Sequence, residues 1–194
     1  MSDSNSSRSL VLVALFAALL AVFGLIPKID LPFGVPITIQ TLGVMLAGCL
    51  LGPWRAFLAM ALFLLAVAFG LPLLSGGRGG LAVFAAPSAG FLLGWPLGAA
   101  ASGAVMALLP GRTPLSLAIK AFAASVVGGI GVVYASGIVG LMTLAHLSAG
   151  QATVASLAFV PGDLVKCIVS ALVVHTVARG PVSYTHLRAH ETGR

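Results

Sequence analysis

Long apolar runs, separated by short polar or proline- and glycine-rich stretches, recur along the chain from Leu10 to Ala178. A helix needs roughly 20 apolar residues to cross a bilayer, with about 17–25 tolerated. The runs that reach or approach this length predict six transmembrane helices, at Leu10–Ile26, Ile37–Leu51, Trp54–Leu71, Ala82–Leu109, Leu117–Leu141 and Phe159–Ala178. No polar linker separates these runs into independent cores, so residues 1–180 are interpreted as one membrane domain.

Two of the predicted spans are irregular. The second is short and follows Pro36, which suits a helix start because its missing N–H would be unpaired there; Gly52-Pro53 then ends the helix. The fourth contains Pro87 and Pro96, which predicts a re-entrant or broken segment followed by a helix. Breaks at membrane depth are tolerated only where protein or a cavity covers the freed backbone. A site near Pro87 is therefore expected.

Composition excludes a water-soluble domain. Of the 194 residues, 59% are hydrophobic and 7% charged, whereas a soluble domain carries about 25% charged residues. The net charge of +6 does not indicate nucleic-acid binding, because the basic residues stand singly between apolar runs. The predicted fold class is an all-α, multi-pass membrane protein.

The distribution of lysine and arginine predicts how the helices are oriented. With both termini cytoplasmic, two basic residues, Lys28 and Arg78, fall in outer loops, and the inner ends hold Arg8, Arg55, Arg112, Lys120 and Arg179. This bias fits the excess of basic residues on the cytoplasmic side of membrane proteins. The loops at 27–36, 72–81 and 142–158 would then face outward.

The two ends of the chain are interpreted differently. The polar start followed by an apolar run resembles a signal peptide, but the run is long enough to span a membrane and is read as a retained first helix. Residues 181–194 become abruptly polar and basic. They are interpreted as a non-native tail with no role in function.

Asp163 and Lys166 are charged residues inside a predicted span. An unpaired charge there costs at least about 2.5–3.5 kcal/mol, and a spacing of three places both side chains on one helical face, close enough to pair. Pro161 and Gly162 fit a helix start, whose positive dipole end favours an anionic group. Two interpretations stay open: an ion pair that holds helices together, or a pair that meets a polar ligand.

A second polar cluster, Thr38, Gln40 and Thr41, lies at the outer start of the second predicted helix. Thr38 and Thr41 share a face, and Gln40 points elsewhere. A threonine can bond a backbone carbonyl one turn back. A buried glutamine carries donors and acceptors that need partners. Gln40 is therefore harder to explain without a binding role than either threonine.

Small residues mark two further segments. The outer loop Gly76-Gly77-Arg78-Gly79-Gly80 is interpreted as a lid whose backbone can approach a ligand closely. The alternative is a flexible connector with no ligand role. On the first helix, Ala14 and Ala18 stand four apart, as do Ala17 and Ala21. Such spacing lets another helix approach closely in lipid, either within the fold or from a partner subunit.

Catalytic patterns are missing from the sequence. No P-loop motif occurs, and Tyr134-Ala135-Ser136-Gly137 lacks the first glycine of an intramembrane serine protease motif. The spans hold no pair of carboxylates, and Cys/His metal spacing is lacking. The chain is therefore predicted not to be an enzyme and to need no cofactor or metal.

Several motifs, in order and spacing, cover nearly all of residues 9–178: Val35-Pro36-Ile37-Thr38-Ile39-Gln40-Thr41-Leu42-Gly43-Val44, Leu50-Leu51-Gly52-Pro53, Gly70-Leu71-Pro72, Gly76-Gly77-Arg78-Gly79-Gly80, Pro87-Ser88-Ala89-Gly90-Phe91-Leu92-Leu93-Gly94 and Pro161-Gly162-Asp163-Leu164-Val165-Lys166. Together they resemble the BioY family, the biotin-specific substrate-capture (S) components of energy-coupling factor (ECF) transporters. The family usually has a Gly-Pro-Thr-Gly-Gly-Tyr-type segment where this chain has Ala86 to Phe91. Phe91 keeps an aromatic ring there but lacks the hydroxyl.

The resemblance implies a multi-pass protein of the bacterial cytoplasmic (inner) membrane that captures biotin with high affinity for uptake. Six helices would enclose the vitamin near the outer face. Besides membrane lipid, the implied partners are an ECF transmembrane scaffold subunit and two ATPase subunits, which alone use ATP. The scaffold would meet Ala14, Ala17, Ala18 and Ala21. The ligand would meet Asp163, Lys166, Arg78, Gly79, Gly80, Thr38, Gln40, Thr41, Pro87, Ser88 and Phe91.

Biotin offers a ureido group with two N–H donors and a carbonyl, a nearly apolar ring and a carboxylate tail. We hypothesise that Asp163 accepts the ureido N–H bonds, and that Lys166 or Arg78 meets the carbonyl or the carboxylate. Two alternatives remain: an S component for another small vitamin, and a structural membrane protein whose ion pair only fixes packing. Titration with biotin separates the three.

Overall fold

The computed structural model describes residues 2–30 and 35–180; residues 181–194, interpreted above as a non-native tail, lie outside the described residues. The described residues are helical and contain no strand, only the isolated bridges Ile29–Ile37 and Leu74–Arg78. The elements, in chain order, are α1 (Ser2–Gly24), α2 (Gln40–Leu51), α3 (Pro53–Ala68), the 3-10 helix η2 (Leu81–Phe84), α4 (Ala89–Leu108), α5 (Pro114–Ala124), the π-helix η3 (Ser125–Val132), α6 (Val133–Leu144), α7 (Ala149–Leu157) and α8 (Val160–Arg179).

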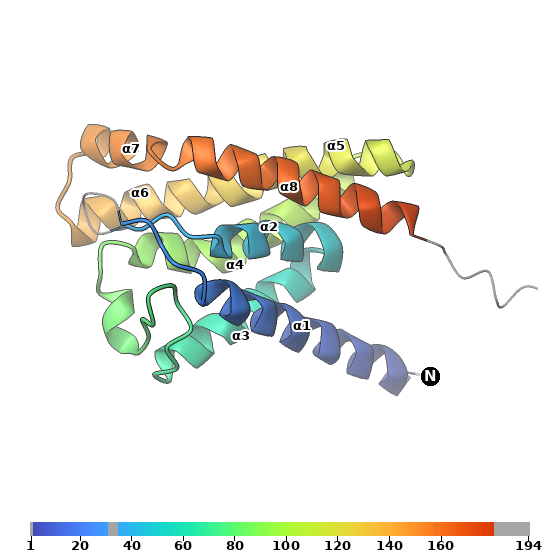
Figure 1. Ribbon diagram of the computed structural model, residues 1–194, viewed down its shortest axis with the longest axis horizontal. Helices are drawn as coiled ribbons and strands as arrows, with labels where there is room; N and C mark the ends of the chain where they lie inside the picture. The colour runs from blue at the N-terminus through green and yellow to red at the C-terminus, as the bar shows by residue number, and fades with distance from the viewer. Residues whose placement is uncertain (1, 31–34, 181–194) are drawn as a thin grey trace, which may run out of the picture.

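The long helices run back and forth between two ends of the molecule (Figure 1). The connections that follow α1, α3 and α6 lie at one end, here called the loop end. The N-terminus, the α2–α3 and α4–α5 connections and the end of α8 lie at the other. The described parts of the three loops predicted to share one side of the membrane, at 27–36, 72–81 and 142–158, are thus all at the loop end.

Four helical stretches are long and apolar enough to cross a membrane: Ser6–Gly24, Ala89–Leu108, Pro114–Leu144 and Val160–Arg179. The third joins α5, η3 and α6 into one rod of 31 residues. The helices α2 and α3 are apolar but have 12 and 16 residues, fewer than the roughly 20 of a full crossing. By length and composition the chain is a membrane protein with four clear candidate spans.

One predicted boundary needs correction, and one predicted break is confirmed. The helix expected from Ile37 begins at Gln40, because Ile37 pairs through its backbone with Ile29, at N···O distances of 2.8 and 3.0 Å. Pro36 therefore precedes an extended segment and not a helix. The predicted span Ala82–Leu109 is broken near Pro87, as expected, but Pro96 lies inside α4 without ending it.

The outer loop predicted at 142–158 contains a further helix, α7. Its first turn is closed by a capping box: the Gln151 N–H donates to the Ser148 hydroxyl at 3.3 Å, and the Ser148 N–H donates to Gln151 Oε1 at 2.9 Å. The pattern Ser-x-x-Gln is a sequence signature of such a helix start. Its presence in this loop could have predicted α7.

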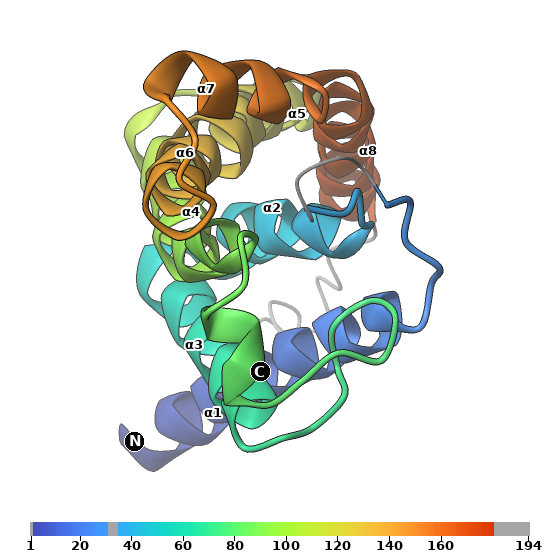
Figure 2. The ribbon, with the colours of Figure 1, turned by 90° about the vertical axis from the view of Figure 1, so that its left-hand side faces the viewer.

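The helix α4 packs against α2, α3 and α6, and the end view of Figure 2 shows it between α3 and α6. Three glycines at four-residue spacing, Gly90, Gly94 and Gly98, face the rod of η3 and α6. A Cβ on Gly90 would collide with the backbone of Gly140, and one on Gly98 with Gly128. The two backbones are therefore in direct contact, the packing that small residues allow between helices in lipid.

Candidate ligand-binding site

A cavity lies at the loop end, where the starts of α2, α4 and α8 converge. Its walls come from the segment 35–41, from Leu74 and Arg78 of the glycine-rich loop, from the first turns of α4 and α8, and from the η3–α6 junction. The empty space between them, including the part open to solvent, is about 560 Å³.

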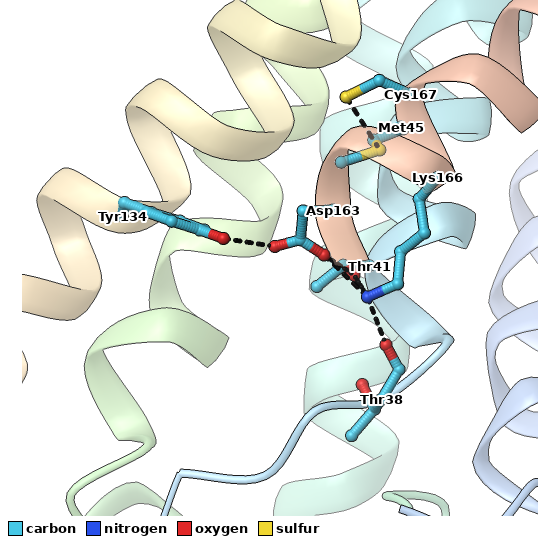
Figure 3. Close-up of polar contacts among 7 residues, drawn as sticks. All are labelled: Thr38, Thr41, Met45, Tyr134, Asp163, Lys166 and Cys167. Atoms are coloured by element: carbon cyan, nitrogen blue, oxygen red, sulfur yellow. Dashed lines mark hydrogen bonds and ion pairs between the residues drawn. The ribbon is translucent and has the colours of Figure 1, made fainter. Parts of the chain in front are cut away.

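Asp163 is the centre of a charged network in the cavity wall (Figure 3). Its Oδ1 accepts hydrogen bonds from Lys166 Nζ at 2.6 Å and from the Thr41 hydroxyl at 3.1 Å, and its Oδ2 accepts one from the Tyr134 hydroxyl at 2.6 Å. Asp163 is 4% exposed and lies in the first turn of α8, where the helix dipole stabilises a negative charge. The pairing predicted from the spacing of Asp163 and Lys166 is confirmed.

Lys166 uses its full set of donors within the protein. Besides Asp163, its Nζ donates to the Thr41 hydroxyl at 2.8 Å and to the Thr38 carbonyl oxygen at 2.7 Å. A lysine ammonium has three N–H donors, so these three bonds occupy all of them. Thr41 thus enters the network through its side chain, and Thr38 through its backbone.

Arg78 is the other cation in the cavity wall. Its Nε donates to the Ser75 carbonyl oxygen at 3.4 Å. Within residues 2–30 and 35–180, its two terminal amino groups form no hydrogen bond or ion pair. Of the two cations considered above for the ligand, Arg78 is therefore the one with donors to spare.

Three aromatic rings form one side of the cavity. Phe91, Tyr134 and Phe159 meet edge to face, with ring centroids 5.6–6.3 Å apart. Trp95, one turn beyond Phe91, packs against Phe63 with centroids 5.9 Å apart. Such rings offer a flat apolar surface, suited to a largely apolar ring system in a ligand.

Two polar atoms in the α4 wall have no hydrogen-bond partner among the described residues, Ser88 Oγ and Trp95 Nε1. Both residues line the cavity and both are 4% exposed. A buried polar group without a partner is unusual in native proteins and calls for a specific explanation.

Gln40 also lines the cavity, but its amide bonds other parts of the protein. Its Nε2 donates to the carbonyl oxygens of Leu20 and Leu73 at 3.0 and 3.1 Å. Its Oε1 accepts from the N–H and the hydroxyl of Ser75, at 3.2 and 3.3 Å. Gln40 therefore joins α2 to α1 and to the loop that follows α3, on a different side from Thr41, as the sequence indicated.

The glycine-rich loop is a tight turn closed by two backbone bonds between Leu74 and Arg78, of 3.0 and 3.2 Å. Gly76 and Gly77 have φ of 81° and 68°, in the left-handed region that favours glycine. These glycines thus fix the geometry that brings Arg78 to the cavity. Gly79, Gly80 and Pro87, predicted as ligand contacts, are not among the residues that line it.

Sequence reasoning missed Tyr134, Trp95 and Phe159 as cavity residues. A signal existed for two of them, because a tyrosine hydroxyl or tryptophan N–H within a long apolar run needs a hydrogen-bond partner once buried. Phe159 gives no such signal, since its ring cannot be told from ordinary core residues.

The four alanines of α1 divide into two pairs. Ala17 and Ala21 pack against the hydrophobic core, whereas Ala14 and Ala18 are exposed. The first pair thus has the internal packing role that was the alternative to a partner contact. The second pair lies on an outward face.

Comparison with known proteins places the chain among transport proteins. The BioY family matches residues 1–181. The biotin transporter BioY of Rhizobium etli is 51% identical over 178 residues, which cover 90% of this chain and 95% of the relative. The Rhodobacter capsulatus biotin transporter BioY is 46% identical over 181 residues, 89% of this chain and 94% of the relative. The crystal structure of the S-component for biotin from an ECF-type ABC transporter superimposes with a TM-score of 0.80 and 26% identity, covering 93% of this chain and 96% of that one.

Proposed function

Since this chain belongs to the BioY family, we propose that it captures biotin for uptake, as the substrate-binding (S) component of an ECF transporter. The Rhizobium etli and Rhodobacter capsulatus relatives, which the chain matches over nearly their whole length, are named biotin transporters. The similar crystal structure is that of an S-component for biotin. The family is one of transporters and not of enzymes.

The observation that carries the proposal is the buried carboxylate of Asp163 in a cavity with an aromatic wall. A carboxylate has about four lone-pair sites, and Asp163 uses three of them for Lys166, Thr41 and Tyr134. The remaining site, on Oδ2, accepts an N–H of the ureido group. Phe91 and Phe159 then lie beside the apolar ring.

Arg78 binds the biotin carboxylate. Of the two cations in the wall, it has terminal amino groups without partners among the described residues, whereas the donors of Lys166 are occupied. The guanidinium fork also matches a carboxylate in shape. Lys166 acts on the ligand through Asp163 and Thr41, which it holds in place.

The proposed arrangement in the membrane has six crossings, with both termini in the cytoplasm of a bacterial cell and the cavity near the outer face. The alternating direction of the helices supports it (Figure 1), as does the excess of basic residues at the terminal end. The two short helices α2 and α3 complete the six.

The proposed partners are an ECF scaffold subunit and two ATPases, which use the ATP, so that this chain itself needs no cofactor. Support comes from the similarity to an S-component of an ECF-type transporter. The exposed pair Ala14 and Ala18 on α1 offers a smooth outward face to the scaffold in lipid. Ala17 and Ala21 contribute by packing α1 onto the core.

Titration of the purified protein in lipid nanodiscs with biotin tests the proposal. Submicromolar, saturable binding is expected for biotin, with no measurable binding of thiamine or riboflavin. Binding of another vitamin in place of biotin would indicate a different substrate. If none of the vitamins binds, the Asp163–Lys166 pair has a structural role alone.

A further inference from the structure

We infer that Trp95 and Ser88 form a donor pair on α4 that binds the carbonyl oxygen of the ligand's ureido group. This inference rests on the proposed function and adds a specificity-determining contact to it. The two residues are seven positions apart, Ser88 directly before α4 and Trp95 two turns into it. That spacing places them on one face of the helix, and both line the cavity.

The indole N–H of Trp95 is the stronger indication. It can donate a hydrogen bond but cannot accept one, and it is buried without an acceptor among the described residues. A buried donor without a partner is costly compared with one that is bonded. Because the N–H belongs to a cavity residue, an acceptor atom of the ligand can remove that cost.

Ser88 supplies a second hydroxyl donor. A serine before the first turn of a helix normally caps it by accepting an N–H with its side chain. Ser88 makes no such capping bond, and its Oγ is buried without a partner within the described ranges. The hydroxyl is thus not used to hold the start of α4, and it belongs to a residue that lines the cavity.

The charges around the cavity indicate which acceptor atom of biotin binds to Trp95 and Ser88. Trp95 and Ser88 are neutral, whereas the carboxylate tail of biotin is best matched by the guanidinium of Arg78. The ureido group carries N–H donors next to its carbonyl, so it can donate to Asp163 while its oxygen accepts from α4. A neutral carbonyl oxygen is therefore the acceptor that Trp95 and Ser88 bind.

The test compares Trp95→Phe with the wild-type protein for two ligands, biotin and 2-iminobiotin. Phenylalanine keeps an aromatic ring against Phe63 but removes the N–H. In 2-iminobiotin an imino group, protonated at neutral pH, replaces the carbonyl and cannot accept a hydrogen bond. We expect Trp95→Phe to weaken biotin binding about tenfold, the equivalent of one lost hydrogen bond, and to leave 2-iminobiotin binding nearly unchanged.

Trp54→Phe is the matched control, because Trp54 is 68% exposed and is not among the residues that line the cavity. It should change neither affinity. Ser88→Ala provides a second variant. Like Trp95→Phe, it should weaken biotin binding and leave 2-iminobiotin binding nearly unchanged. An equal loss for both ligands, or no loss for either, would overturn the inference while leaving biotin capture intact. A wild-type protein that does not bind biotin would instead refute the proposed function.

Discussion

Gln40 and Thr41 are neighbours on α2 and belong to two polar clusters that use their bonds differently. The Gln40 cluster, with Leu20, Leu73 and Ser75, is neutral, and every polar atom of the glutamine amide is bonded within the protein. The Asp163 cluster, with Lys166, Thr41, Tyr134 and the Thr38 carbonyl, is charged and lines the cavity, and its carboxylate accepts three hydrogen bonds where about four are possible.

The difference shows how one helix start can serve two tasks. The neutral cluster fixes the loop over the cavity to α1 and α2, and has nothing left for a ligand. The charged cluster forms part of the cavity wall, and the carboxylate of Asp163 can accept one further hydrogen bond. Variants in the charged cluster should therefore remove contacts to biotin and lower its affinity most. Variants in the neutral cluster should act mainly by raising the rate at which bound biotin dissociates.

The largest effect is expected for Asp163→Asn. The change removes the negative charge that accepts from Lys166 and Tyr134, and breaking a buried pair costs about 3 kcal/mol or more. Biotin affinity, measured by titration in nanodiscs, should fall by about 100-fold or more. The control is Asp30→Asn, since Asp30 pairs with Lys28 in a loop and its side chain is 72% exposed. Unchanged affinity in Asp163→Asn would rule out a ligand role for this carboxylate.

An intermediate effect is expected for Gln40→Leu, which removes all four bonds of the neutral cluster. Without them the loop that carries Arg78 opens more often, and labelled biotin should dissociate about tenfold faster in a chase experiment, in line with the loss of one to two net hydrogen bonds. Gln151→Leu, a change at the exposed start of α7, should leave the dissociation rate as it is. A slower association with normal dissociation would contradict the assigned role.

The smallest effect separates the two threonines. Thr41→Val removes a hydroxyl that bonds both Asp163 and Lys166, and should weaken biotin binding about three- to tenfold. Thr38→Val keeps the backbone carbonyl that accepts from Lys166 and should change affinity by less than about twofold. Equal effects of the two variants would show that the side chain of Thr38, and not its backbone, holds the ligand or the lysine.

Much of this fold could be predicted from the sequence, because lipid demands long apolar helices and the prolines and glycines mark their ends. Pro53 and the break near Pro87 were readable in this way. The start of α2 was not, because the backbone pairing of Ile37 with Ile29 depends on how the preceding segment folds back. Pro96 does not end α4, since a proline inside a packed membrane helix is tolerated.

The charged residues of the site were also readable, because a buried charge in a span needs a reason to be there. The contribution of Tyr134 was not, since its bond to Asp163 joins residues 29 positions apart on different helices. Gln40 was predicted as a ligand contact from its polarity alone. Only the surrounding backbone shows that its amide is used elsewhere, and the sequence carries no pattern for such tertiary bonds.

The glycine contacts between α4 and the rod of η3 and α6 have a consequence for changes in ligand range. Where two backbones touch, neither helix can move toward the other, and any added side chain forces them apart. Phe91 and Trp95 project from this closely packed part of α4, so their wall cannot shift toward the rod. A variant that accepts a larger or smaller vitamin is therefore most readily obtained by exchanging these two side chains, with every glycine of the contact kept.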